Sequence, residues 1–277
     1  MDGYNARFLS GDHVLEPPAA TSSDVSNDLA PTKAGDLVRH YTHFSLAMSA
    51  SRRFCRWVAW NIDGGDLREI DREGIPFILD EAYEPKFQVN NDLYEHNALD
   101  RGHIARRADL LWGSDGEAEQ ANIDSFFFTN ITPQADDFNQ SSKHGLWGEL
   151  ENAIFADSKV DDLRLSLFGG PIFKDTDLPY RELKVPRSYW KVIGYVEDNT
   201  LKAKAYMLTQ DDLESKLESL GLEEFKLYQL TLQELATMTG LDFGPLATAD
   251  TMIEAGAETL GQLPVRQVES RADLVAA

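Results

Sequence analysis

The stretch from residue 99 to residue 107 reads Leu99-Asp100-Arg101-Gly102-His103-Ile104-Ala105-Arg106-Arg107. Gly102 frees the backbone just before His103 from side-chain restrictions, and Arg101 places a permanent cation beside that histidine. A histidine near an arginine and Asp100 can keep a pKa close to neutral, as a general base requires. The pattern therefore makes His103 a candidate general base, although a structural or surface histidine fits the same residues.

Three segments further along the chain supply amide and carboxylate oxygens: Asn130-Ile131-Thr132-Pro133-Gln134, Phe138-Asn139-Gln140 and Leu150-Glu151. Amide oxygens suit hard cations such as Mg²⁺, which keeps several of its waters, so Asn139 is a candidate metal ligand. Glu151 is a candidate acceptor of hydrogen bonds from metal-bound waters. Simpler roles stay open: Asn130 and Gln134 can satisfy the backbone at a strand end, Asn139 can cap a helix, and Glu151 can lie on a solvated helix face.

Together, these four segments resemble the DNA/RNA non-specific endonuclease family, which includes the Serratia-type nucleases and endonuclease G. The segments follow the family's order and nearly its spacing. Segments that look like the family's core, at 57–61, 168–173, 185–191 and 239–243, extend the resemblance to about residues 40–245. The resemblance implies a ββα-metal (His-Me finger) nuclease fold of the α+β class, in which helices flank a central, mostly antiparallel sheet.

The resemblance also implies a role for each matching residue. His103 would activate a water for in-line attack on phosphorus, leaving a 5′-phosphate and a 3′-hydroxyl. Asn139 would be the direct protein ligand of Mg²⁺, or of Mn²⁺ in its place, and Glu151 would hold the metal-bound waters. Arg101 would help to neutralise phosphate charge, and Asn130 and Gln134 would support the loops of the site. We group His103, Arg101, Glu151 and Asn130 as the catalytic set and Asn139 as the metal ligand.

Two positions depart from the family's pattern. The family often carries an arginine four residues after the helix glutamate, where this chain has Phe155. It also often carries one on the strand before the motif, where residues 77–82 offer none. A different cation would then have to serve at the phosphate, and Arg72 is a candidate.

The distribution of apolar residues indicates how the chain is organised. We expect strands at 56–62, 76–79, 125–130 and 163–168, the last halted by Gly169-Gly170-Pro171. Asp198-Asn199-Thr200 predicts a hairpin between strands 189–196 and 202–208, and Gly240 closes a short helix at 233–239. This mixture predicts an α+β fold. We divide the chain into a loosely ordered arm at 1–35, a nuclease domain at 36–250 and a C-terminal helix or tail at 251–277.

The net charge of the 277-residue chain is −21, which alone argues against a polyanionic substrate, because phosphate binding relies on Lys and Arg. Locally basic stretches weaken that objection. They hold Arg101, Arg106 and Arg107 in the first stretch, and Arg181, Lys184, Arg187 and Lys191 in the second. A solvated surface is the alternative for the second stretch. The candidate substrate-binding residues are Arg106, Arg107, Gln134 and Arg187, with DNA and RNA as the substrates.

The sequence contains no apolar run of the roughly 20 residues that cross a bilayer. Its first residues lack the basic region and apolar stretch of a secretory signal. We therefore expect no membrane partner and a cytoplasmic location, with export by a non-classical route left open. A non-specific nuclease in the cytoplasm would threaten its own genome, so an inhibitor or a regulatory partner is expected. A homodimer is left open.

Three other functions compete with the nuclease reading. A binding module of the same fold is disfavoured by the intact His103, Asn139 and Glu151. A phosphodiesterase for small substrates would suit the acidic composition. A zinc hydrolase has little support, because Cys55 is the single cysteine and only His103 and His144 lie near the site.

Overall fold

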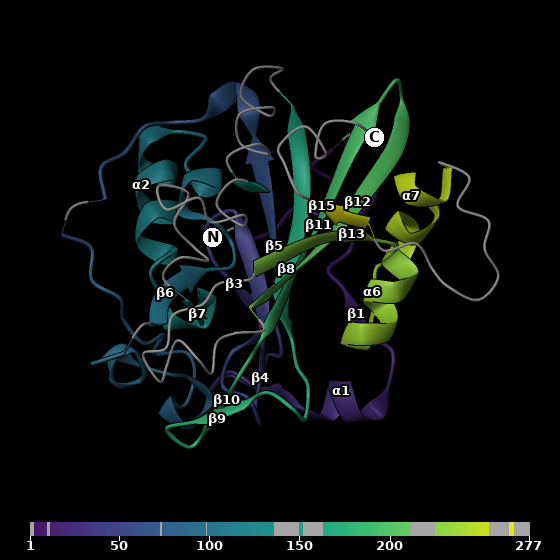
Figure 1. Ribbon diagram of the computed structural model, residues 1–277. Coiled ribbons are helices and arrows are strands. Elements are labelled where there is room, and N and C mark those ends of the chain that lie inside the picture. Colours follow the sequence, from purple (N-terminus) through teal and green to yellow (C-terminus); the bar gives the residue numbers. More distant parts are fainter. Residues whose placement is uncertain are drawn as a thin grey trace.

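The computed structural model describes residues 3–9, 12–72, 74–97, 99–135, 150–151, 163–210, 225–254 and 266–268. Within these ranges the centre of the molecule is a nine-stranded sheet (Figure 1) with the strand order β15-β13-β12-β11-β8-β5-β4-β2, and β3 pairs with β4. Every pairing in this sheet is antiparallel. The strands are β2 (Leu29–Ala30), β3 (Arg39–His40), β4 (Phe44–Ser49), β5 (Cys55–Asp63), β8 (Arg164–Ile172), β11 (Ser188–Glu197), β12 (Thr200–Gln210), β13 (Phe225–Leu230) and β15 (Arg266–Val268).

Both faces of this sheet are covered by apolar side chains. Successive side chains of a strand point to opposite faces: on β11, Tyr189 and Ile193 enter one buried cluster, whereas Trp190 and Val192 enter another. Burial on both sides explains why the central strands read as nearly continuous apolar runs. The predicted α+β fold with a central antiparallel sheet is confirmed.

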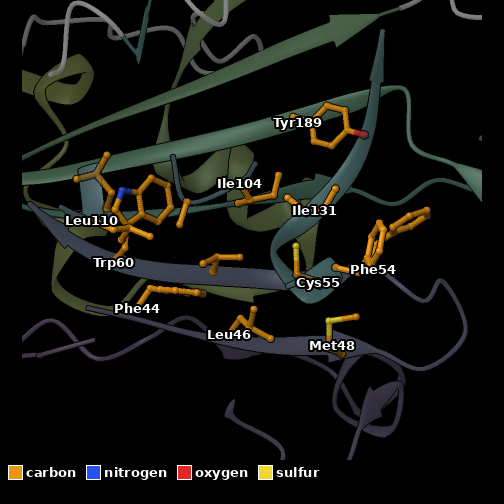
Figure 2. Close-up of a cluster of buried hydrophobic side chains, with 14 of the residues drawn as sticks. Phe44, Leu46, Met48, Phe54, Cys55, Trp60, Ile104, Leu110, Ile131 and Tyr189 are labelled. Carbon is orange, nitrogen blue, oxygen red and sulfur yellow. The ribbon is translucent and has the colours of Figure 1, made fainter. Parts of the chain in front are cut away.

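The two faces carry different elements. Figure 1 shows α2 (Asp115–Asp124), β6 (Leu99–His103) and β7 (Ile131–Ala135) on one side of the sheet, and α6 (Leu232–Thr239) and α7 (Thr251–Glu254) on the other. Ile104 and Ile131 anchor the β6–β7 pair in the core, where Figure 2 shows them within the cluster that also holds Trp60 and Tyr189. This packing fixes the segment around His103 against the sheet.

Shorter elements complete the described structure. Two-stranded pairings join β1 (Ala19–Ala20) to β14 (Leu241–Asp242) and β9 (Leu178–Tyr180) to β10 (Leu183–Val185). The helix α1 spans Ser23–Asn27. In the N-terminal segment that we expected to be a loose arm, Tyr4, Phe8 and Leu15 are buried and β2 joins the sheet. The domain boundaries themselves stay a prediction. No helix in the described ranges is long and apolar enough to cross a membrane.

Two local predictions are confirmed by backbone geometry. Asp198 and Asn199 have positive φ angles of 48° and 64°, as a two-residue hairpin turn between β11 and β12 requires. Gly240 has a φ of 68° and caps α6 in the left-handed conformation, a conformation that glycine adopts without the steric penalty of a side chain.

Two predicted strands and the predicted end of a third are wrong. Residues 125–130 follow the end of α2 as a turn and a 3₁₀ helix at Phe128–Asn130, and the strand starts only at Ile131. The run of aromatic residues imitates a strand because Phe126 and Phe128 are buried in a compact turn. Residues 76–79 form only an isolated bridge, between Ile78 and Phe127. The strand β8 does not end at Gly169-Gly170-Pro171 but continues to Ile172. At Gly170, a Cβ would lie 2.8 Å from a backbone oxygen of β5. The glycine therefore allows close strand packing.

Candidate active site

The pairing of β6 with β7 positions His103. His103 is the last residue of β6 and lies opposite Ile131. Asn130 secures the next turn of chain: its Oδ1 accepts a hydrogen bond from the Ala105 N–H at 2.9 Å, and its Nδ2 donates to the Ala105 carbonyl at 3.0 Å and the Ser125 carbonyl at 3.1 Å. Asn130 is fully buried. It therefore supports the loops around His103 from within the protein, and its side chain does not face a substrate.

Gly102 makes room for Gln134. A Cβ at Gly102 would lie 2.1 Å from Gln134 Cδ, and Gly102 is not among the residues with a positive φ. The glycine is thus needed for close packing, and our explanation from backbone freedom is wrong. Gln134 is fully buried, and its Nε2 donates to Thr132 Oγ1 at 3.3 Å. This location under β6 does not support the prediction that Gln134 binds substrate.

His103 lies against aromatic rings. Its ring is edge-on to Phe126, with centroids 5.3 Å apart, and 5.8 Å from the ring of Phe77. The side chain is half-buried, and its Nε2 is buried without a hydrogen-bond partner in the described part of the chain. Burial lowers the pKa of His103 to about 3, and the charges of Arg72 and Arg107 add to the shift. The pKa is thus lower than we expected from the sequence, and the imidazole is neutral at pH 7, with a lone pair available to a proton.

Two arginines lie on the same aromatic rings. The Arg72 guanidinium lies over the Phe126 ring, 5.6 Å from its centroid, and Arg72 is exposed. The Arg101 guanidinium lies 5.5 Å from the Phe77 centroid, and its Nε donates to Asn91 Oδ1 at 3.0 Å. Neither arginine forms an ion pair with a carboxylate among the described residues, whereas Arg68 and Arg106 do. The two cations beside His103 are therefore available to an anionic ligand.

Glu151 lies in a cluster of buried charges. The Lys191 Nζ lies 2.7 Å from Glu151 Oε1, and Lys191 is fully buried. Arg106 donates from Nη1 to the Glu151 carbonyl at 3.0 Å, and its Nε lies 3.9 Å from Oε2. Glu151 is only 8% exposed, so the alternative of a solvated helix face is wrong. Its carboxylate is held by two cations.

Asp109 completes the same cluster. Its Oδ2 accepts a hydrogen bond from Trp60 Nε1 at 3.1 Å, and its Oδ1 is buried without a partner among the described residues. Burial raises the pKa of Asp109 to about 6, and the charges of Arg106 and Lys191 oppose that rise. The cluster thus contains two cations and two carboxyl groups.

Of the remaining predicted residues, Arg107 lies near His103, because its charge lowers the pKa of the histidine. The Arg107 Nη1 donates to the Ile70 carbonyl at 3.0 Å and to Asn122 Oδ1 at 3.1 Å, so part of its guanidinium joins the segment around Ile70 to α2. The Arg187 backbone N–H donates to Asp177 Oδ1, and no contact between Arg187 and His103 is found in the described structure. The predicted metal ligand Asn139 lies outside the described residues, as do His144 and Phe155.

Sequence reasoning missed Asp109 and the role of Lys191. The sequence contains a signal for Lys191, because this lysine lies on the same face of a predicted strand as the apolar residues Tyr189 and Ile193. Lysine is almost never fully buried unless it is paired. That position therefore called for a buried acidic partner, although the sequence does not say which one.

Among the described residues, the Glu151 carboxylate supplies the type of oxygen donor that a hard cation prefers. The described residues contain no group of three or more His, Cys, Asp or Glu side chains that could hold a metal ion. The carboxylate of Glu151 and the amide of Asn139 are oxygen donors, which Mg²⁺ prefers. Few protein ligands and many waters are the arrangement that such a set can support.

Comparisons with known proteins agree with this geometry. A solved structure of an EndoG/EndoGI complex matches with a TM-score of 0.60 and 19% identity, covering 84% of this chain and 96% of that chain. The Serratia marcescens nuclease is 25% identical over 234 residues, 81% of this chain and 76% of the relative. An uncharacterized protein of Sinorhizobium fredii is 32% identical over 220 residues. That match covers 76% of this chain but only 33% of the relative's length.

The fold and the comparisons define the class: this is a nuclease of the ββα-metal type. The family model described as DNA/RNA non-specific endonuclease matches residues 21–250. This chain belongs to the DNA/RNA non-specific endonuclease family, a family of metal-dependent nucleases.

Proposed function

We propose that this chain is a Mg²⁺-dependent endonuclease that hydrolyses phosphodiester bonds in DNA and RNA without sequence preference. The observation that carries the proposal is the environment of His103: its Nε2 has no partner within the described structure, and the two aromatic rings against which it lies also carry the guanidinium groups of Arg72 and Arg101. A base beside two uncommitted cations is the arrangement that attack on a phosphodiester needs. Mn²⁺ is expected to replace Mg²⁺.

His103 takes a proton from the water that attacks phosphorus. The new P–O bond forms as the P–O3′ bond breaks, so one product carries a 5′-phosphate and the other a 3′-hydroxyl. Arg72 and Arg101 bind the phosphate oxygens and offset the charge that develops on them. Asn139 and Glu151 would hold the metal, which when bound supplies charge stabilisation at the phosphate and at the leaving oxygen.

The chemistry of the two arginines supports non-specific cleavage. Contacts to phosphate oxygens fix the position of a nucleic acid but carry no sequence information. The charge of Arg72 lowers the pKa of His103, and Arg101 lies over Phe77, a ring that flanks His103; we propose that the scissile phosphate binds there. Because DNA and RNA share that phosphate, the same contacts serve both polymers.

A protein inhibitor remains part of the proposal. The structural neighbour's title names a complex with EndoGI and the mechanism of EndoG inhibition, and that statement concerns EndoG. For this chain we propose an inhibitor or regulatory partner on the grounds of self-protection. A cytoplasmic location also stays a proposal, and a homodimer stays open.

Digestion of three polymers tests the proposed function. Supercoiled DNA, single-stranded DNA and RNA should all be cut with Mg²⁺ or Mn²⁺ and left intact in excess chelator. Asn139→Ala should weaken the dependence on metal far more than Asn152→Ala, a nearby amide that serves as the control. Full activity in chelator would overturn the metal dependence, and cleavage restricted to small diesters would overturn the assignment to nucleic acids.

A further inference from the structure

Lys191 occupies a position that neither solvent nor a nucleic acid reaches. It lies in β11, between β8 and β12, opposite Gly169 on one side and Tyr206 on the other. The side chain is fully buried. A lysine at such a position cannot bind a phosphate of the substrate, so its charge has to be used inside the protein.

The partner of Lys191 is Glu151. The 2.7 Å distance between Lys191 Nζ and Glu151 Oε1 is that of a charge-assisted hydrogen bond. The same Nζ lies 5.3 Å from the Trp60 ring centroid, which limits its freedom to turn away. A side chain from the centre of the sheet thus fixes one oxygen of the carboxylate.

Arg106 holds the same residue from a second direction. Its Nη1 donates to the Glu151 carbonyl, and its Nε lies 3.9 Å from Oε2. Arg106 follows the β6 segment that carries His103. The contact therefore ties the position of Glu151 to the position of the base.

This arrangement suits positioning better than it suits stability. Buried ion pairs stabilise proteins poorly in comparison with well-packed apolar side chains, because both charges lose their hydration. A carboxylate can accept about four hydrogen bonds, so the one hydrogen bond from Lys191 and the longer ion pair with Arg106 leave acceptor sites on the Glu151 carboxylate for waters. The two cations fix the direction in which those sites point.

We propose that Lys191, together with Arg106, is a positioning residue that holds the Glu151 carboxylate in the orientation that receives metal-bound waters. The proposal rests on the proposed function, because it acts through Glu151. It changes the role of Arg106: the sequence suggested a contact with substrate, and the structure assigns a contact with a protein carboxylate.

The test uses three variants, which are Lys191→Met, Glu151→Gln and the double variant that carries both changes. The control variant is Lys204→Met. Methionine keeps the length of the side chain and removes the charge. Lys204 is the matched control, because it pairs with Ile193 two residues along the same hairpin and therefore lies on the same face of the sheet as Lys191. The readouts are kcat and KM on supercoiled DNA, Mn²⁺ affinity by calorimetry without nucleic acid, and the melting temperature.

Lys191→Met should lower kcat by about 10–100-fold, the usual effect of losing a group that orients a metal's surroundings, and should leave KM unchanged. Its Mn²⁺ affinity should fall with kcat. The double variant should be as slow as Glu151→Gln alone, because both changes break one interaction. It should also melt higher than Lys191→Met, since no unpaired buried charge remains. Lys204→Met should match the wild type in kcat, KM and Mn²⁺ affinity.

Wild-type kcat and Mn²⁺ affinity in Lys191→Met would overturn the proposal. Losses that multiply in the double variant would also overturn it, because Lys191 would then act independently of Glu151. If Lys191→Met does not fold, the comparison of the double variant with Glu151→Gln still tests the proposal, because a double variant slower than Glu151→Gln alone would overturn it. A Glu151→Gln variant at the wild-type rate would instead refute the role given to Glu151 in the proposed function.

Discussion

The two sides of the site use the same kinds of side chain in opposite ways. Beside His103, Arg72 and Arg101 rest on aromatic rings without carboxylate partners in the described structure. Around Glu151, Lys191 and Arg106 are committed to a protein carboxylate. In the proposed function, Arg72 and Arg101 bind the substrate, whereas Lys191 and Arg106 hold the Glu151 carboxylate in place. In that function, Arg72 and Arg101 are what allows a chain with a net charge of −21 to bind a polyanion.

The largest effect should come from the base. His103→Ala should lower the single-turnover cleavage rate by about 10²–10⁴-fold, the range expected when a general base is lost. Binding of nucleic acid should remain, because Arg72 and Arg101 are untouched. Single-turnover cleavage of supercoiled DNA measures the rate, and His40→Ala, at an exposed histidine of β3, is the control. Wild-type turnover by the alanine variant would remove His103 from the mechanism.

Loss of the Asn130 side chain should show how far the position of His103 depends on the hydrogen bonds that hold the chain after it. Asn130→Ala leaves the buried N–H and carbonyl of Ala105 without partners, which costs about 1–3 kcal/mol for each unsatisfied group. The free energy of unfolding, measured by urea denaturation, should fall, and cleavage should slow because the chain after His103 is no longer fixed. Unchanged stability would show that Asn130 does not hold this turn.

Salt dependence should distinguish the two pairs of cations. Each phosphate contact contributes about 0.9 to the slope of log K against log salt for duplex DNA. Arg72→Gln should lower the slope by about that amount and weaken binding to all sequences equally. Arg106→Gln should leave the slope unchanged and lower kcat. A smaller slope in Arg106→Gln would mean that Arg106 contacts the substrate, and the contrast between the two sides would collapse.

The stability of the protein should also depend on pH through Asp109. Its pKa is raised from 3.8 to about 6 in the folded state, so the folded protein binds this proton more tightly than the unfolded chain. The stability that the neutral form contributes is complete below about pH 4 and is lost as the pH rises through about 6. Between about pH 4 and 8, Asp109→Asn should gain on the wild type by roughly 3 kcal/mol. A difference in unfolding free energy that is constant with pH would contradict this.

The sequence indicates the candidate catalytic residues better than it indicates the side chains that hold them in place. The segment from Asp100 to His103, the hairpin turn at Asp198-Asn199 and the end of α6 at Gly240 are local patterns, and local patterns are readable from the sequence. The pairing of Lys191 with Glu151 joins residues that are 40 positions apart, so no local pattern contains it. The turn at 125–130 was mistaken for a strand because a short continuous run of aromatic residues, Phe126 to Phe128, is also typical of a buried strand.

The chemical ends of the products test the central claim most directly. DNA and RNA oligonucleotides of one sequence, cleaved in H₂¹⁸O and analysed by mass spectrometry, report which atom attacks and which bond breaks. Attack by a water activated at His103 predicts 5′-phosphates that carry the label, and 3′-hydroxyls, from both polymers alike. Unlabelled 5′-phosphates, 3′-phosphates from DNA, or a 2′,3′-cyclic phosphate from RNA would contradict the account.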